Sequence, residues 1–254
     1  MKLTFLGTGT SQGVPVITCD CEVCRSLDPR DKRLRSSVHF EEEDFSVVID
    51  SGPDFRQQAL RENIKRLDAL VFTHEHKDHT AGMDDIRSYN FSQKEDIPIY
   101  ARKPVVEQLK REFSYIFENQ KYPGIPRIKV NYIENEEFKI KGRKILPIEV
   151  MHLNLPVFGF RIGDISYITD AKTITPKEIE KIKGSKILVL NALRIQEHYS
   201  HLNLEEAIAL AKKINAEKTY FTHISHLLGK HHEVEKTLPE NVHLAYDGLS
   251  VSDS

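Results

Sequence analysis

The chain has 254 residues, enough for one large domain or two small ones, and we expect a single domain over residues 1–254. Hydrophobic residues make up 39% of the sequence, which suffices for a core and excludes a disordered chain. The formal net charge of −2 excludes a global electrostatic attraction to nucleic acid or to an anionic membrane.

Signals for export and membrane insertion are weak. The N-terminus is too short and mixed in character for a signal peptide, and no apolar run approaches the ~20 residues of a membrane span. Three cysteines, an odd number, argue against a disulfide framework. We therefore expect a cytoplasmic protein without a membrane partner.

The first predicted strand covers residues 2–6 and leads into a glycine-rich loop over residues 7–13. Such a loop can bind a nucleotide, but no amphipathic helix follows it and no acidic residue stands at the dinucleotide spacing. We expect instead a tight turn that lets the backbone approach the functional site.

A cysteine array follows, with Cys19, Cys21 and Cys24 in the spacing C-x-C-x-x-C. Thiolates this close together in a reducing compartment favour a structural zinc site over a redox pair. Three sulfurs leave one tetrahedral position, for which His226 is the natural fourth ligand. The alternative is three unligated cysteines on a loop.

The next elements lead to a histidine cluster. Residues 37–40 and 45–50 read as a hairpin, residues 54–64 as a helix, and the apolar run that ends at Phe72 as a buried strand. That strand runs directly into residues 73–79, Thr-His-Glu-His-Lys-Asp-His. Surface histidines in a polar loop are the alternative interpretation, but the apolar strand before them favours a site.

The spacing of this cluster suits metal ions. In an extended loop residues two apart point the same way, so His74 and His76 can bind one cation together. The chain then turns, and Asp78 with His79 can face a second cation. Imidazole and carboxylate suit Zn²⁺, Mn²⁺ or iron.

The motif H-x-H-x-D-H resembles the signature of the metallo-β-lactamase-fold hydrolases. That family carries three further ligands at the ends of later strands, and His152, Asp170 and His223 match them in order. The resemblance implies that His74, His76 and His152 hold one metal and that Asp78, His79 and His223 hold the other. Asp170 would bridge the two.

The pairing of the cysteine array with His-Ile-Ser-His at residues 223–226 narrows the resemblance. Together with Gly-Thr-Gly at residues 7–9 and Gln-Gly-Val-Pro at residues 12–15, it resembles the PhnP-type phosphodiesterases, which act on phosphoribosyl 1,2-cyclic phosphate. The implied fold is αββα, two mixed sheets flanked by helices, and the order of predicted elements fits it. One departure is Asn191, where the PhnP-type pattern has an aspartate; it leaves the transfer of the PhnP acid machinery and substrate open.

The middle of the chain matches this pattern least. Residues 82–87 should begin a helix, on which Arg87 is either a clamp for substrate phosphate or the partner of Asp84. Residues 104–120 predict an apolar helix, interpreted as a flap or as a subunit contact of a possible homodimer. The remaining predicted elements are strands at 138–140, 144–150, 158–162, 166–169, 186–190 and 218–222 and helices at 176–183 and 204–214.

The function implied is a dinuclear metal phosphodiesterase. Two divalent cations, Zn²⁺ or Mn²⁺, make hydroxide available at neutral pH for attack on phosphorus. Asp78 and His201 are the expected catalytic residues, with His201 matching a family histidine near the leaving group. The alternative for His201 is a surface histidine that caps the following helix.

Three other functions compete with a small, possibly cyclic, phosphodiester substrate. A tRNA 3′-end nuclease of this fold carries a basic arm rich in glycine and proline, which residues 101–127 match poorly, so we expect no nucleic-acid partner. Thioester or lactam hydrolysis lacks its usual sequence features here. A non-catalytic protein of the coenzyme-biosynthesis type shares the cysteine array, but the intact set of seven ligands disfavours it.

Overall fold

The computed structural model describes residues 1–118 and 122–253. Its first sheet has the strand order β15-β1-β2-β3-β4-β5-β6. These strands are β1 (Lys2–Gly7), β2 (Ser37–Glu42), β3 (Phe45–Ile49), β4 (Ala69–Val71), β5 (Ile97–Ala101), β6 (Ile128–Tyr132) and β15 (Ser250–Ser252).

The second sheet has the order β11-β8-β9-β10-β12-β13-β14, and β7 pairs with β8 beside this path. Its strands are β7 (Phe138–Ile140), β8 (Arg143–His152), β9 (Leu155–Ile162), β10 (Ile165–Tyr167), β11 (Thr173–Ile174), β12 (Ile187–Asn191), β13 (Lys218–Thr222) and β14 (Val242–Leu244).

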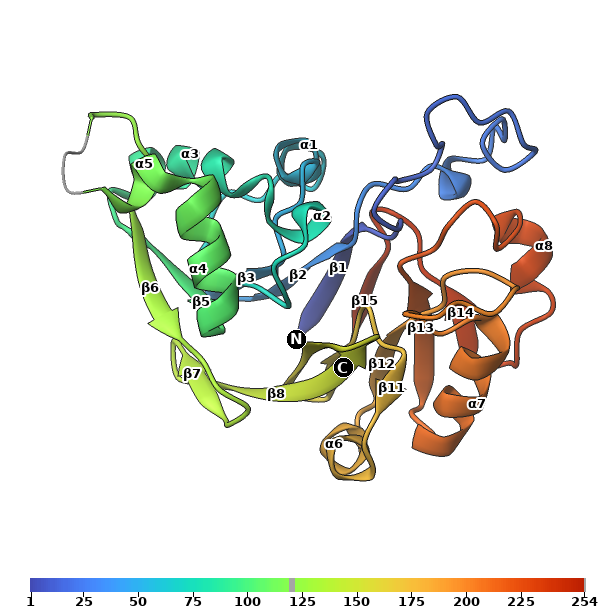
Figure 1. The fold of residues 1–254 in the computed structure, drawn as a ribbon. Coiled ribbons are helices and arrows are strands. Elements are labelled where there is room, and N and C mark those ends of the chain that lie inside the picture. The colour runs from blue at the N-terminus through green and yellow to red at the C-terminus, as the bar shows by residue number, and fades with distance from the viewer. Residues whose placement is uncertain (119–121, 254) are drawn as a thin grey trace.

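The helices form two groups (Figure 1). One group comprises α1 (Phe55–Arg61), α2 (Lys77–Thr80), η2 (Met83–Ile86), α3 (Arg87–Gln93), α4 (Lys103–Glu112) and α5 (Ser114–Phe117). The other comprises α6 (Pro176–Ile182), α7 (Leu204–Ile214) and α8 (His231–Glu235), and a short helix η1 (Pro29–Asp31) lies in the N-terminal loop. No helix in the described part of the chain is long and apolar enough to cross a membrane.

Three layers of apolar side chains hold the sheets and helices together. Between the sheets, Phe5 and Phe40 of the first pack with Phe160 and Tyr167 of the second. One outer layer joins the first sheet to α1, α3 and α4, and the other joins the second sheet to α6 and α7. The αββα fold with two mixed sheets is therefore confirmed.

Local sequence explains several element boundaries. The side chain of Asn203 accepts from the amide of Glu206, and the Glu206 side chain accepts from the amide of Asn203, which forms a capping box at the start of α7. Asn203, rather than His201, thus caps this helix. Asn215 ends α7 in a left-handed conformation.

The helix expected over residues 104–120 is wrong as a single element. Phe113 leaves helical geometry, with φ −122° and ψ 43°, and separates α4 from α5. Residues 119 and 120 lie outside the described residues. Phe113 and Ile116 are buried in the layer that covers the first sheet, so the chain's own core accounts for their apolar character without a flap or a subunit contact.

Other boundaries also differ from expectation. The helix expected over residues 54–64 ends at Arg61, because Asn63 is left-handed with φ 54°. The helix expected from residue 82 begins as a 3₁₀ turn at Met83 before α3. Strands β5, β6, β11, β14 and β15 were not predicted.

Candidate metal centre

The candidate ligands lie in segments that directly follow strands of both sheets. Asp50 follows β3, residues 73–79 follow β4, and His223 follows β13. In open sheets with parallel strands, this end is where ligands bind. The loops of both sheets therefore deliver side chains to one region.

Three residues of this region share an uncommon backbone conformation. Asp50, Asp170 and His223 have φ values of 65°, 56° and 53°. Aspartate and histidine are among the residue types that tolerate this left-handed region best. Each residue therefore ends its segment in a turn, and the same three side chains enter the cluster described below.

The first group of ligands converges around His74. Its Nε2 lies 3.0 Å from Nδ1 of His76, and the His76 and His152 rings are 5.2 Å apart. Nδ1 of His74 donates to Thr73 Oγ1 at 2.9 Å, while Nδ1 of His152 donates to the Ser200 carbonyl at 3.0 Å. These bonds leave Nε2 of His74 and of His152 with a lone pair for a cation.

The second group surrounds Asp170. Its Oδ2 lies 3.3 Å from His79 Nε2, and its Oδ1 lies 3.2 Å from His223 Nε2. Asp78 Oδ2 lies 3.3 Å from the same nitrogen of His79 and 3.9 Å from that of His223. The Asp170 carboxylate also lies within 4.8 Å of a ring nitrogen of His74 and of His152, so it is close to both groups.

His201 joins this cluster. Its ring lies 4.5 Å from that of His152 and 4.8 Å from that of His223, and its Nδ1 is 3.8 Å from Asp170 Oδ1. Burial, reinforced by His223, lowers the pKa of His201 to about 3. The side chain is therefore neutral at pH 7 in this arrangement.

Charge in the cluster is strongly polarised. Burial opposes ionisation of Asp78 and Asp170, yet His79 and His223 lower the pKa of each carboxyl below its ordinary value. Burial likewise opposes a charged His79, but Asp78 and Asp170 raise the pKa of that imidazole well above its ordinary value. Three carboxylates around His79, counting Asp50, thus require positive charge at the centre of the group.

The residues fit divalent cations. Nε2 of His79, Nδ1 of His201 and both ring nitrogens of His223 are buried without a hydrogen-bond partner among the described residues. Unpaired buried polar atoms are unfavourable unless something satisfies them. Imidazole nitrogens and carboxylates at this spacing are the donor set that Zn²⁺ and Mn²⁺ accept.

Asp50 is a site residue that the sequence analysis did not single out. It accepts from His79 Nδ1 at 2.7 Å, from the Thr73 amide at 2.8 Å and from Thr73 Oγ1 at 2.8 Å. Its available signal was an aspartate directly after an apolar strand, in the sequence Asp-Ser-Gly. A Cβ on the following Gly52 would lie 2.0 Å from the Asp78 carbonyl, so this turn must pass close to the ligand loop.

Similarity to known proteins agrees with this geometry. Residues 46–224 match the Beta-lactamase superfamily domain. The chain belongs to this superfamily.

Proteins with several different names resemble the chain. The crystal structure of a diphosphatase from the PhnP family is 41% identical, has a TM-score of 0.93, and the match covers 100% of this chain and 98% of that one. An octanoyltransferase of Porphyromonas gingivalis is 38% identical over 252 residues, or 98% of this chain and 51% of that protein. The chain therefore spans about half the length of that relative.

A third relative is a ribonuclease Z of Listeria innocua, which is 24% identical over 314 residues, 97% of each chain. These similarities confirm a protein of the metallo-β-lactamase fold close to the PhnP type. Its clusters of histidine and aspartate have the composition and spacing to hold metal ions.

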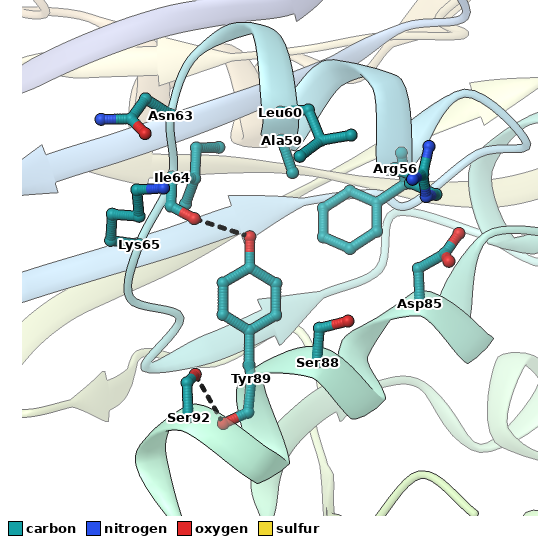
Figure 2. A pocket seen from close by; sticks show the side chains of 11 residues that line it. Arg56, Ala59, Leu60, Asn63, Ile64, Lys65, Asp85, Ser88, Tyr89 and Ser92 are labelled. Atoms are coloured by element: carbon teal, nitrogen blue, oxygen red, sulfur yellow. Dashed lines mark hydrogen bonds between the residues drawn. The ribbon is translucent and has the colours of Figure 1, made fainter.

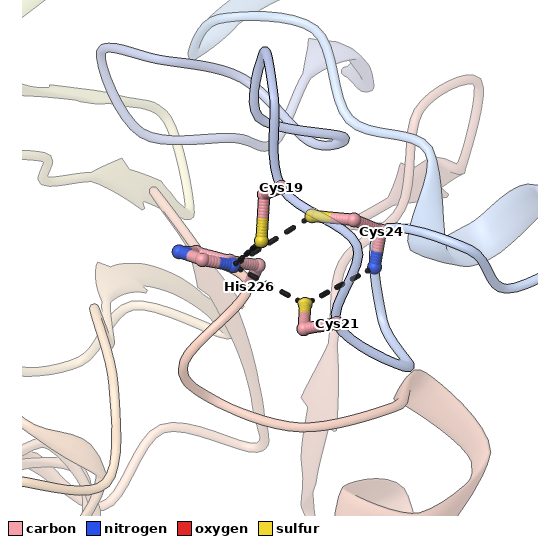
Figure 3. A group of neighbouring side chains, drawn as sticks. All are labelled: Cys19, Cys21, Cys24 and His226. Atoms are coloured by element: carbon pink, nitrogen blue, oxygen red, sulfur yellow. Dashed lines mark hydrogen bonds between the residues drawn. The ribbon is translucent and has the colours of Figure 1, made fainter.

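A separate cluster of three cysteines and His226 joins the N-terminal loop to the segment that follows β13 (Figure 3). Sγ of Cys19 and of Cys21 lie 3.3 Å from His226 Nδ1, and Sγ of Cys24 lies 3.6 Å from it. Although burial opposes the thiolate, the Cys24 amide and His226 lower the pKa of Cys21 to about 6. Burial raises the pKa of Cys24 to about 11. Three sulfurs around one nitrogen fit a tetrahedral zinc ion.

Asn191 and Arg87 have structural partners. The Asn191 side chain accepts from the Ala171 amide at 2.8 Å and donates to its carbonyl at 3.0 Å, so it holds the turn after Asp170.

Arg87 is exposed and pairs with Asp84, which also accepts a hydrogen bond from Tyr115. The pair with Asp84 is one of the two arrangements predicted for Arg87, and the clamp for substrate phosphate stays a prediction.

A pocket of about 370 Å³ lies apart from the ligands, between α1 and α3 (Figure 2). Phe55 and Ile64 line it together with Tyr89, whose hydroxyl donates to the Ile64 carbonyl at 3.1 Å. None of its lining residues is a predicted metal ligand. The pocket is therefore distinct from the candidate metal centre.

Proposed function

We propose that this hydrolase is a phosphodiesterase that cleaves a small phosphate ester or diphosphate with two divalent cations. The observation that carries the proposal is the position of Asp170. Its carboxylate lies 3.3 Å from His79 and 3.2 Å from His223, both of one predicted group, and within 4.8 Å of His74 and His152 of the other. A carboxylate shared by two groups of imidazoles is the arrangement that a dinuclear site requires. The similarity to a PhnP-family diphosphatase supports the same class of substrate.

The seven ligands would hold the cations, with the bridging and grouping implied by the resemblance. They are His74, His76, Asp78, His79, His152, Asp170 and His223. Two divalent cations bound there would activate a water molecule and neutralise charge on the phosphoryl oxygens.

Neighbouring residues orient these ligands. Asp50 fixes His79 directly and His74 through Thr73, while the Ser200 carbonyl fixes His152. Each bond commits one ring nitrogen as a donor and leaves the other for a cation.

His201 would hold the proton for the leaving oxygen. It is neutral in its buried setting, but a bound phosphoryl group places negative charge beside the ring and raises its pKa. The proton would leave from Nε2, because Nδ1 faces Asp170. Proton transfer by a positioned histidine typically contributes about 10²–10⁴-fold to the rate.

Charges around the ligand segments favour a small substrate. Lys77 pairs with Glu112 at 3.0 Å and Lys172 pairs with Glu206 at 2.7 Å. Arg102 donates to the Pro156 carbonyl at 2.9 Å. Because these cations already have partners, they offer no basic track for a long polyanion.

The second candidate function is tRNA 3′-end processing, favoured by the similarity to ribonuclease Z. To separate the two, the Mn²⁺- or Zn²⁺-loaded protein is assayed with bis(p-nitrophenyl) phosphate, cyclic phosphates, dinucleoside diphosphates and a precursor tRNA. We expect turnover of small substrates that disappears in Asp170→Ala. Preferential cleavage of the precursor tRNA, with binding that falls steeply with salt, would establish the second candidate instead. A protein inactive on every substrate would contradict both.

A further inference from the structure

A braced loop beside the candidate metal centre presents a tyrosine to solvent. The ends of the loop are joined by bonds from the Leu193 amide to the Leu202 carbonyl and from the Leu204 amide to the Arg194 carbonyl, each 3.0 Å long. The Arg194 guanidinium donates to the Glu197 carbonyl at 2.7 Å inside the loop. Tyr199 lies on this loop with 71% of its surface exposed.

A row of rings connects this tyrosine to the ligands. The Tyr199 ring stacks on that of His198 at 4.4 Å with an interplanar angle of 26°. The His198 ring lies 5.1 Å from that of His201, which stacks on the His223 ring at 4.8 Å. The row thus runs from solvent to a ligand of the metal centre.

The β8–β9 hairpin carries a second exposed side chain close to the segment that contacts this loop. The hydrogen bond from His152 Nδ1 to the Ser200 carbonyl joins the tip of the β8–β9 hairpin to the loop. Leu153 follows His152 and is 51% exposed, while Tyr199 precedes Ser200. Leu153 and Tyr199 are thus each one residue away along the chain from an end of this bond.

We propose that Tyr199 is a specificity-determining residue that stacks on the base of a nucleotide whose phosphoryl group is bound at the metal centre. This inference rests on the proposed phosphodiesterase function and names its substrate class. The rings of His198 and His201 lie between Tyr199 and His223, so a base on Tyr199 and a phosphoryl group at the metal centre would be held apart, as a pentose holds them apart in a nucleotide.

Tyr199 and the braced loop that carries it favour the stacking of a neutral planar ring. Tyrosine supplies a rigid stacking surface with few rotatable bonds, and the braced loop limits the entropy lost on binding. Stacking of a base on an aromatic side chain is typically worth about 5- to 100-fold in affinity when the side chain is replaced by alanine.

The test compares two probes that differ only in the base. AMP and ribose 5-phosphate are titrated calorimetrically into the Mn²⁺-loaded wild-type protein and into Tyr199→Ala, Tyr199→Phe and Tyr132→Ala. Tyr132 is 55% exposed on β6, at an edge of the first sheet, and serves as the matched control. We expect Tyr199→Ala to weaken AMP by about 5- to 100-fold and to leave ribose 5-phosphate unchanged. Tyr199→Phe and Tyr132→Ala should bind both probes as the wild type does.

Equal affinity of the wild type for AMP and ribose 5-phosphate would overturn the inference, as would equal weakening of both by Tyr199→Ala. An effect of Tyr199→Ala on precursor tRNA but not on AMP would assign the residue to RNA and overturn the small nucleotide. The experiment distinguishes failure of this inference from failure of the proposed phosphodiesterase function. Hydrolysis of bis(p-nitrophenyl) phosphate with no dependence of AMP binding on Tyr199 refutes only the inference. Tyr199-dependent AMP binding without hydrolysis of any diester refutes only the reaction.

Discussion

Asp50 accepts a hydrogen bond of 2.7 Å from Nδ1 of His79, and both side chains are buried. The same carboxylate accepts from Thr73 Oγ1, which in turn accepts from His74. Asp50, which is outside the predicted ligand set, thus orients His79 of one predicted group and His74 of the other. Burial raises the pKa of Asp50, while His79 and the Thr73 bonds oppose that rise.

Removing the charge of Asp50 should therefore weaken metal binding without removing a ligand. We expect Asp50→Asn to lower the affinity for Zn²⁺ and Mn²⁺ by about 10–100-fold, the usual effect of losing such a partner. Calorimetric titration of the metal-free protein measures it. Asp44→Asn, at an exposed position in the β2–β3 turn, is the control and should bind as the wild type does. Unchanged affinity in Asp50→Asn would refute the orienting role.

Asp170 and His152 should differ in how many cations they control. Asp170 lies within ligand distance of both groups, so Asp170→Ala should reduce bound catalytic metal from two ions toward none. His152→Ala should weaken mainly one ion. Elemental analysis of the dialysed variants gives the metal content, after subtraction of zinc at the cysteine cluster. A loss of one ion in both variants would contradict the bridging position.

The cysteine cluster should matter for stability more than for chemistry. A structural zinc contributes directly to folding free energy. We expect Cys21→Ser to lower Tm by about 5–10 °C, given ~2–4 °C per kcal/mol for a chain of this size. Activity per folded molecule should change little. Ser11→Ala, exposed in the same loop, is the control, and an unchanged Tm and zinc content in Cys21→Ser would exclude the site.

His201 should matter most for substrates with poor leaving groups. His201→Ala is expected to lower kcat by about 10²–10⁴-fold for alkyl phosphodiesters, because an alkoxide needs a proton. The loss should be smaller for p-nitrophenyl esters, and metal content should stay the same. His198→Ala is the matched control with a smaller expected effect. Equal losses for both substrate types, or loss of a metal, would make His201 a positioning residue or a ligand.

Acid should destabilise the fold through His39. Burial lowers the pKa of His39 to about 4, and its Nε2 donates to Ser46 Oγ at 2.8 Å. Between the unfolded pKa near 6.5 and the folded pKa, the unfolded chain binds a proton that the folded chain does not, so stability falls as pH falls. This contribution reaches about 1.4 kcal/mol per pH unit. Urea denaturation from pH 7 to 4.5 should show a shallower decline for His39→Gln, and parallel curves would refute the assignment.

The structure brings together the candidate ligands that the histidine cluster and the family resemblance indicated, because these residues end or follow strands with a readable apolar pattern. The structural roles of Asp50 and Asn191 could not be predicted, since they depend on partners 20 to 29 residues away along the chain. The pKa of His201 could not be predicted either. Its loop is polar in sequence, but tertiary packing buries the ring among other imidazoles. Strands β14 and β15 have three residues each, too few for a periodic pattern to be recognised.

The left-handed backbone at Asp50, Asp170 and His223 restricts how this site can change. Each position needs a particular side chain and, at the same time, a residue type that tolerates positive φ, so few substitutions satisfy both requirements. Asparagine preserves the turn, whereas a β-branched residue would strain it. Variation that alters substrate preference is therefore better tolerated at the exposed residues Leu153 and Tyr199 than among the candidate metal ligands. A mutagenesis library for new activities would begin there.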